Sequence, residues 1–346
     1  MTSMDLETGV ERVTCPVADE FTISRGTTET ATTVVVRVSD GDYTGVGGVA
    51  PAAYYDETPD SVEAALPDLL AAVESVGDPH AQQAIAGRLA DLAPGAPAAR
   101  AAVSGAVHDL AGRQAAEPLY RRWGLDPEAA PPTSYTVGIA DPGEMADRAA
   151  RASDAGFEVL KVKVGTEDDR ARVRAVREAA PDARLRADAN EAWEPERAAE
   201  MAAWLADRGV EFLEQPCPTV AWIRQVREAG HLPVAADESC VTAADVPAVA
   251  DAVDIAVTKL GKCGGLRPAA RQVAAANAHG LEAMVGCMVA SDAAIAPACH
   301  LAPLCDYADL DGALLLSEDP YEGVPVEDGR MDLRAVDAGT GERPAE

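Results

Sequence analysis

The chain has 346 residues, 48% of them apolar, and a formal net charge of −29 at pH 7. This apolar content supports a large core without disulfides or structural metals, and the negative charge argues against nucleic acid or an anionic membrane surface as a partner. Acidic residues are spread along the whole chain, and lysine is nearly absent. Such a composition is typical of a protein adapted to concentrated salt, where screening removes self-repulsion.

Cysteine and histidine usage indicates neither a disulfide framework nor a zinc site. The seven cysteines are odd in number and lack CxxC spacing, and the five histidines are scattered. The segment MTSMDLETGVERV is acidic and has no apolar signal region, and no stretch of the chain is apolar enough to span a membrane. We expect a soluble, cytoplasmic protein, and a homo-oligomer is compatible with the sequence.

The first third of the chain combines strand and helix patterns. Residues 12–50 predict strands, with ATTVVVRV and YTGVGGVA flanking Asp40-Gly41, a dipeptide suited to a tight hairpin. Helical spacing begins after Thr58, a suitable N-cap, and a second helix is predicted over residues 97–114. The prolines of segment 126–132 then predict a domain boundary.

Beyond this boundary, eight short apolar runs alternate with helical stretches. Alternation of this kind implies parallel β/α units, and eight of them predict an α/β fold of the (β/α)₈ TIM-barrel class. From the second run onward, the residues that end the runs are spaced by 22 to 28 positions: Lys163, Asp188, Glu214, Asp237, Lys259, Cys287 and Asp309.

All four lysines of the chain lie in two of these run ends, VLKVKVG and VTKLGKCGG. The carboxyl ends of barrel strands form one ring, so the polar residues there converge across the mouth. Three carboxylates in that ring suit Mg²⁺, with Mn²⁺ as an alternative. A lysine on each side suits proton transfer on both faces of a bound carbon. A single acid would be read as solvated surface, but convergence of this whole set indicates a site.

Five motifs carry a family resemblance: K-x-K at 161–163, D-A-N at 188–190, E-Q-P at 214–216, D-E-S at 237–239, and K-x-x-x-x-G-G from 259. With these, the chain resembles the enolase superfamily, in its muconate-lactonizing subgroup, over nearly its whole length. The resemblance implies a TIM barrel with an α+β capping domain built from both ends of the chain. The implied parts are the N-terminal cap at 1–128, the catalytic barrel at 129–311, and a segment returning to the cap at 312–346.

The superfamily shares one step, removal of a proton α to a carboxylate with Mg²⁺ stabilising the enediolate. The resemblance implies that Lys163 and Lys259 are the acid/base groups and that Lys161 is an auxiliary cation that keeps the pKa of Lys163 low. Asn190 and Glu238 are expected to orient the ligands and the lysines. The implied metal ligands are Asp188, Glu214 and Asp237.

The remaining lysine and the histidines are expected to have supporting or structural roles. Lys262 is predicted to be a surface or supporting residue. A mandelate-racemase-like site would need a His-Asp pair, but His300 lies inside a predicted helix, so it is interpreted as structural.

Substrate recognition is inferred from the eighth strand and from a cap loop. Asp309 and Asp311 form a D-x-D that resembles the dipeptide epimerases, in which two carboxylates hold the substrate's α-ammonium group. Arg25 resembles the residue that pairs with an acidic side chain in Ala-Glu epimerases, and Thr136 is a further substrate-binding candidate. A solvated loop and a surface arginine are the competing interpretations. The expected reaction is 1,1-proton transfer on a dipeptide of the L-Ala-D/L-Glu type.

Two departures from the family pattern concern the pocket. Ala290 replaces a Glu that is usual in G-C-M-x-E-S, and Gly48 stands where a Glu is usual in the cap hairpin. The alternatives on this scaffold are a muconate-type cycloisomerase, an N-acylamino-acid racemase or o-succinylbenzoate synthase, and a metal-binding but silent homologue. A Schiff-base aldolase is an alternative of another class, although it leaves the carboxylates unexplained.

Overall fold

The computed structural model describes residues 5–345, so the first four residues of the predicted cap and the last residue of the predicted C-terminal segment lie outside the described part. The fold begins with an antiparallel sheet of β1 (Glu7–Ile23), β2 (Gly26–Ser39) and β3 (Thr44–Val49). The hairpin predicted at Asp40-Gly41 joins β2 to β3 and is confirmed. Asp40 closes this turn by accepting the backbone N–H groups of Asp42 and Tyr43.

Four helices follow this sheet: α1 (Pro59–Val76), α2 (Gln82–Leu92), α3 (Pro97–Ala115) and α4 (Leu119–Arg122). The two helices predicted from the sequence are α1, capped by Thr58, and α3. Strand β3 lies directly on α3, because a Cβ added to Gly45 or Gly47 would come within 2.3 Å of the helix backbone. The glycines of GVGGV therefore serve close packing of a strand on a helix.

The predicted barrel is present as one parallel sheet in which each strand pairs with the next strand of the chain. Its strands are β4 (Tyr135–Val137), β5 (Val159–Lys163), β6 (Arg184–Asp188), β7 (Val210–Glu214), β8 (Val234–Ala236), β9 (Ile255–Thr258), β10 (Glu282–Gly286) and β11 (Tyr307–Asp309). A single bridge, Thr133 to Ala308, joins the two ends of the sheet. The barrel is therefore nearly closed.

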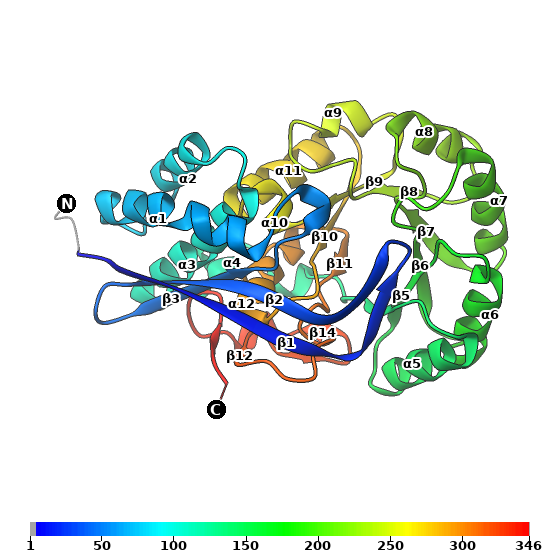
Figure 1. Ribbon diagram of the computed structural model, residues 1–346, viewed down its shortest axis with the longest axis horizontal. Coiled ribbons are helices and arrows are strands. Elements are labelled where there is room, and N and C mark those ends of the chain that lie inside the picture. The colour runs from blue at the N-terminus through cyan, green and yellow to red at the C-terminus, as the bar shows by residue number, and fades with distance from the viewer. Residues whose placement is uncertain (1–4, 346) are drawn as a thin grey trace.

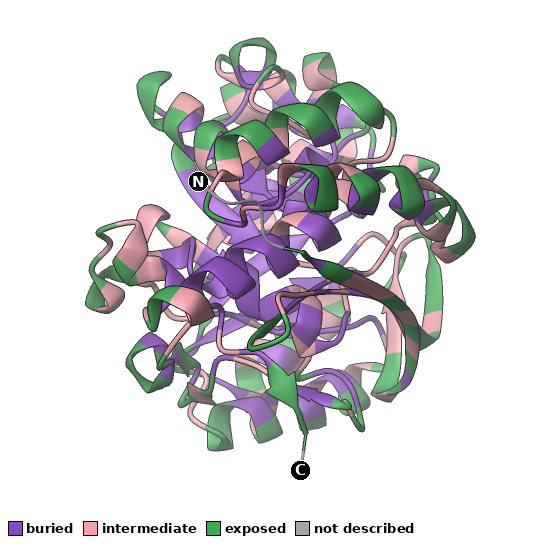
Figure 2. Cartoon of the chain, turned by 90° about the vertical axis from the view of Figure 1, so that its left-hand side faces the viewer, coloured by how far each residue is buried: buried purple, intermediate pink, exposed green. Residues whose placement is uncertain are grey.

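Helices surround the barrel on its outside, as Figure 1 shows for α5 to α8. They are α5 (Pro142–Asp154), α6 (Asp169–Ala179), α7 (Pro195–Ala206), α8 (Val220–Glu228), α9 (Val246–Val249), α10 (Leu260–Cys263), α11 (Leu266–Ala278) and α12 (Asp292–Cys299). Buried residues gather in the interior and exposed ones lie on the outer faces (Figure 2). No helix among residues 5–345 is long and apolar enough to cross a membrane.

The C-terminal segment lies against α3 and the start of α4. It contains the short strands β12 (Tyr321–Glu322), β13 (Val326–Glu327), β14 (Arg330–Met331) and β15 (Arg343–Pro344). The Gly339 carbonyl accepts the N–H of Leu119 at 2.7 Å, and Gly339 N–H donates to Glu117 O at 3.0 Å. These hydrogen bonds join the C-terminal segment to the chain between α3 and the start of α4.

His300 follows the last residue of α12 and is fully buried, so it lies just outside the helix in which it was expected. Its Nδ1 accepts the N–H of Tyr120 at 3.1 Å, and its Nε2 lies 3.2 Å from Thr340 O. Burial lowers the pKa of His300 to about 4, which keeps the ring neutral. These contacts give His300 a structural role.

Asp109 connects three parts of the fold from a fully buried position on α3. Its carboxylate accepts the N–H of Val46 at 2.9 Å and of Thr340 at 2.7 Å, and it pairs with Arg113 Nε at 2.8 Å. We expect Asp109→Ala to lower the free energy of unfolding by about 2–5 kcal/mol, since it leaves buried donors unpaired. Urea unfolding at fixed salt measures this. The exposed Asp91→Ala is the control, and an equal effect of both changes would contradict the assignment.

Candidate active site

The structure brings the five predicted ring residues together at the carboxyl ends of consecutive strands. Lys163, Asp188 and Glu214 are the last residues of β5, β6 and β7, and they are paired in register with their neighbours. Asp237 and Lys259 directly follow β8 and β9. All five are buried. Since β5 and β9 are four strands apart in an eight-stranded barrel, Lys163 and Lys259 approach the mouth from opposite sides.

Lys161 lies between the carboxylates of three strands. It precedes Lys163 by two residues and therefore faces the same side of β5. Its Nζ is 2.7 Å from Asp309 Oδ2, 2.8 Å from Glu214 Oε2 and 3.1 Å from Asp188 Oδ2. Burial disfavours the ammonium form, but these three charges outweigh it and raise the pKa of Lys161. Lys161 is thus held as a cation.

Lys163 and Asn190 meet at Asp188. The Lys163 ammonium donates to Asp188 Oδ2 at 2.6 Å and to Asn190 Oδ1 at 3.3 Å. Asn190 donates its backbone N–H to Asp188 Oδ1 at 2.9 Å and its amide to Glu238 Oε1 at 3.2 Å. Its φ of 43° lies in the left-handed region, which asparagine tolerates better than most residues. Asn190 therefore connects Lys163, Asp188 and Glu238.

Two lysines contact Asp237 on the other side of the ring. Lys259 Nζ donates to Asp237 Oδ2 at 2.9 Å, and Lys262 Nζ donates to Asp237 Oδ1 and to the Asp237 carbonyl, both at 2.6 Å. The alternative that Lys262 lies on the surface is wrong, because its side chain is fully buried and also donates to Val257 O and Cys240 O. The short α10 folds Lys262 back beneath the strand end that precedes it.

Carboxylates outnumber cations at the mouth. Against four ammonium groups and the partly exposed Arg25 stand six buried carboxylates, those of Asp188, Glu214, Asp237, Glu238, Asp309 and Asp311. Neither oxygen of Glu214 accepts a hydrogen bond within the described chain. Burial, with the charge of Asp188 added, raises the pKa of Glu214 to about 8. Glu214 is therefore a buried acid whose ion pair in the described chain is with Lys161 alone.

The donor set of the ring fits a hard divalent cation, which prefers carboxylate oxygens. Among residues 5–345, no group of His, Cys, Asp or Glu side chains is already arranged around a single point as a metal-ligand cluster. Lysine ammonium groups lie between the carboxylates instead. Two observations favour a cation there: the buried carboxylates outnumber the cations, and Glu214 accepts no hydrogen bond in the described chain.

The two acids of the D-x-D are buried beside β4. Asp309 accepts the hydroxyl of Ser134 at 2.5 Å, and Asp311 accepts the N–H of Thr136 at 2.5 Å. Burial raises the pKa of Asp311 to about 7, with a further contribution from the charge of Asp309. Both acids border the cavity, so the interpretation of the D-x-D as solvated loop is wrong. Sequence reasoning missed Ser134, which directly precedes β4 and lies two residues before Thr136.

Cap loops close the mouth from above and leave a cavity of about 820 Å³. Arg25 lies in the turn between β1 and β2, and its Nη2 pairs with Glu238 Oε1 at 2.7 Å. Tyr54 and Tyr55, in the short helix Ala53–Tyr55, also line this cavity and were missed, because loop aromatics give no periodic signal. The sequence-predicted candidates Arg25, Thr136, Asp309 and Asp311 all border the cavity.

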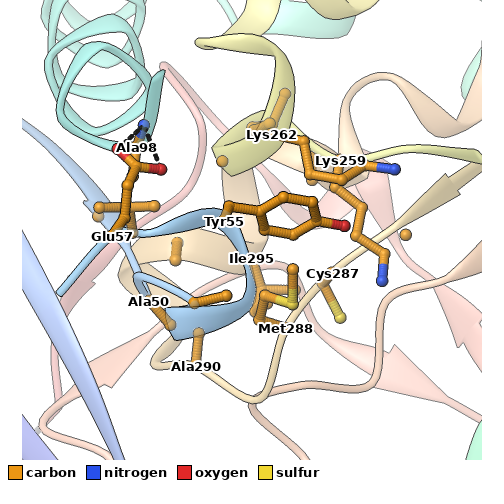
Figure 3. A pocket seen from close by; sticks show the side chains of 18 residues that line it. Ala50, Tyr55, Glu57, Ala98, Lys259, Lys262, Cys287, Met288, Ala290 and Ile295 are labelled. Carbon is orange, nitrogen blue, oxygen red and sulfur yellow. Dashed lines mark hydrogen bonds between the residues drawn. The ribbon is translucent and has the colours of Figure 1, made fainter. Parts of the chain in front are cut away.

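A smaller pocket of about 40 Å³ lies behind Tyr55, whose ring points toward Lys259 and Lys262 in Figure 3. Gly48 and Ala290, the two departures from the family pattern, both line it. A Cβ on Gly48 would lie 3.0 Å from the backbone of Ala293, so a larger side chain there would require movement of α12. The two replacements therefore alter the same small pocket, which Lys259 also lines.

Gln215 was also missed, although it lies inside the E-Q-P motif. Its Oε1 accepts the N–H groups of Asp237 and Ser239, and its Nε2 donates to Cys217 O at 3.0 Å. It thereby orients the strand end that carries Asp237. Its position directly after Glu214, inside the motif, is the signal that would have found it.

Known proteins resemble both the sequence and the fold. An L-Ala-D/L-Glu epimerase of Bacteroides thetaiotaomicron is 37% identical over 320 residues, covering 90% of this chain and 82% of that protein. A substrate-liganded complex of the L-Ala-D/L-Glu epimerase from Bacillus subtilis matches over 100% of both chains, with 30% identity and a TM-score of 0.91. A dipeptide epimerase from Enterococcus faecalis, complexed with Mg and L-Leu-L-Tyr, covers 98% of this chain and 99% of its own, with 32% identity and a TM-score of 0.87.

Two family models cover most of the chain. Residues 6–124 match the mandelate racemase/muconate lactonizing enzyme N-terminal domain, and residues 144–346 match the enolase C-terminal domain-like family. The matches agree with the sheet-and-helix cap and the barrel described above. The chain therefore belongs to the mandelate racemase/muconate lactonizing enzyme family of the enolase superfamily.

Proposed function

We propose that this protein is a Mg²⁺-dependent dipeptide epimerase, which removes the proton α to the substrate carboxylate on one face and returns a proton on the other. The observation that carries the proposal is the pair of buried lysines, Lys163 and Lys259, facing each other across the carboxylate ring. Two amines on opposite sides of one carbon are what a 1,1-proton transfer requires. The relatives that act on dipeptides support this reading.

In this proposal Asp188, Glu214 and Asp237 hold the divalent cation, with Mg²⁺ preferred and Mn²⁺ as an alternative. The bound cation supplies charge stabilisation for the enediolate oxygens. Asn190 and Glu238 orient these ligands, and Lys161 supplies positive charge to the substrate carboxylate.

The protonation state of Lys259 depends on its ion-pair partner, Asp237. Burial disfavours its ammonium form, but the charge of Asp237 outweighs burial and raises the pKa of Lys259. A general base needs a pKa near the working pH. A cation held by Asp237 would draw on the negative charge that now compensates Lys259, and so would favour the neutral amine that a general base requires.

The buried D-x-D is proposed to hold the α-ammonium group of the dipeptide, next to Thr136. Asp309 is already paired with Lys161 at 2.7 Å, whereas Asp311 has no ion pair with a lysine or arginine in the described chain. A substrate ammonium would provide the missing partner for Asp311. A free amine at the substrate's N-terminus follows as a requirement, and this separates the proposal from an N-acylamino-acid racemase.

N-acetylation of a dipeptide substrate should lower its kcat/KM by about thirtyfold to several thousandfold, because a buried carboxylate loses its charged partner. Since the pKa of Asp311 is about 7, KM for the free dipeptide should rise as the pH falls below 7 and the acid takes up a proton. Steady-state kinetics at one ionic strength measure both effects.

Asp311→Asn is the matched variant, and it should reduce discrimination between the free and acetylated substrates. Equal turnover of the acetylated dipeptide by the native enzyme would replace the proposal with acylamino-acid racemisation. Borohydride trapping of a carbonyl substrate would instead indicate an imine-forming lysine, as in an aldolase.

Several broader expectations also belong to the proposal. The chain is divided into a cap of residues 1–128, a barrel of residues 129–311 and a returning segment of residues 312–346. The protein is salt-adapted, soluble and cytoplasmic, and it is compatible with homo-oligomerisation. The burial of all four lysines supports salt adaptation, because it leaves arginine as the side chain that carries permanent positive charge on the acidic surface.

A further inference from the structure

The outer part of the large cavity contains one group of paired charges, which we call the Arg25 clasp: Arg25, Tyr54, Glu191 and Glu238. Arg25 donates from Nη2 to Glu238 Oε1 at 2.7 Å, and from Nη1 to Glu191 Oε2 at 3.4 Å and Asn190 O at 3.3 Å. Its guanidinium carbon lies 4.4 Å from the centre of the Tyr54 ring. The Tyr54 hydroxyl donates to Glu191 Oε1 at 2.9 Å. The clasp thus joins two cap loops to two barrel loops.

The charged groups of the clasp are already paired with one another. Both oxygens of Glu191 and both terminal nitrogens of Arg25 have partners, so neither residue offers a free charge to a ligand. Two carboxylates face one guanidinium, which makes the clasp net negative. A third carboxylate, brought by a substrate side chain, would be repelled.

Moving Arg25 to a substrate would also leave Glu238 uncompensated. The Glu238 side chain is 2% exposed, and its Oε2 has no hydrogen-bond partner within the described chain. Only the Glu238 side of this pair is buried, since the Arg25 side chain is 34% exposed, and loss of Arg25 would leave the buried Glu238 charge without its partner. Arg25 is therefore a poor candidate for binding the side chain of a glutamate substrate.

Outside the clasp, the outer cavity is uncharged. Its lining combines apolar side chains with threonine hydroxyls, such as Phe21, Ile23, Leu315, Thr28 and Thr30. The other charged residues that line the cavity belong to the ring, to Lys161 or to the D-x-D. Beyond the clasp, this part of the lining offers no charged partner to a substrate side chain.

We infer that the preferred substrates are dipeptides whose second residue has no acidic side chain, and that Arg25 is a positioning residue that holds the cap against the barrel. This inference rests on the proposed epimerase function. It replaces the expectation, drawn from the family resemblance, that Arg25 pairs with a glutamate side chain of the substrate.

The first test compares L-Ala-L-Leu and L-Ala-L-Phe with L-Ala-L-Glu and L-Ala-L-Lys, by deuterium incorporation at the second α-carbon in D₂O at one ionic strength. L-Ala-L-Leu, L-Ala-L-Phe and L-Ala-L-Lys should each have a kcat/KM at least about tenfold higher than L-Ala-L-Glu. An equal or higher value for L-Ala-L-Glu would overturn the inference but leave the epimerase function intact. Failure of every dipeptide to exchange would overturn both.

The second test changes the charge of the clasp. Glu191→Gln removes one of its two carboxylates, so kcat/KM for L-Ala-L-Glu should rise roughly tenfold, while that for L-Ala-L-Leu changes less than about threefold. Glu194→Gln is the matched control, because Glu194 is an exposed acid in the same loop without an ion pair to Arg25, and it should change neither value. Equal effects of the two variants would overturn the inference.

The third test separates positioning from substrate binding. Arg25→Met should lower kcat/KM for all four dipeptides by similar factors, because the cap loses its contact with Glu238. A loss confined to L-Ala-L-Glu would overturn the inference, since it would identify Arg25 as the subsite for the glutamate side chain. Thermal unfolding checks that Arg25→Met is folded. If this variant does not fold, the Glu191→Gln result tests the inference instead.

Discussion

Lys163→Ala and Lys259→Ala should each reduce epimerisation by about 10²–10⁴-fold, because each removes the proton-transfer group from one face of the substrate carbon. The two lysines approach from opposite sides of the barrel, so each variant keeps the amine of the other face. Each variant should therefore exchange the α-proton of only one substrate stereoisomer. Polarimetry for epimerisation and proton NMR in D₂O for exchange measure the two effects separately.

The matched controls are Lys163→Arg and Lys259→Arg. Arginine keeps the positive charge beside Asp188 or Asp237 but does not lose its proton. These variants should be as inactive as the alanine variants if the lysines are bases, and largely active if their role is only to form ion pairs. One-sided exchange in Lys161→Ala, with both faces retained in Lys163→Ala, would show that the base was assigned to the wrong lysine of the K-x-K.

Removal of divalent cations should abolish activity, and Mg²⁺ should restore it. An α-proton next to a carboxylate is not removed at useful rates unless the enediolate charge is stabilised. Glu214, whose oxygens accept no hydrogen bond in the described chain, is expected to be a ligand together with Asp188 and Asp237. Assays after exhaustive chelation, followed by addition of Mg²⁺, measure the effect.

Cation binding provides a second measurement that does not depend on turnover. The pKa of Glu214 is about 8, and a ligand must be deprotonated, so Mg²⁺ affinity measured by calorimetry should increase as the pH rises toward 8. Asp237→Asn should weaken binding, whereas Asp182→Asn, an exposed acid before β6 at the opposite end of the barrel, should not. Full activity after chelation, or unchanged binding in Asp237→Asn, would contradict the ligand assignment.

The sequence by itself determined the barrel and the membership of its ring. Short apolar runs at near-constant spacing predict parallel β/α units, and the carboxyl ends of such strands must face one side. Polar residues at the run ends, from Lys163 to Lys259, therefore had to meet at one mouth. That inference needs only periodicity and chain order, which are properties of neighbouring residues.

Only the tertiary structure decided which charges are paired at the mouth. Lys262 looked like a surface or supporting residue, but α10 folds its side chain under β9 against Asp237. Arg25 is predicted from the sequence to bind a substrate acid, and the structure adds that loops far apart in the sequence bring Glu191 and Glu238 to it. The strength of a charge contact depends on distance and burial in space, and local sequence patterns record neither.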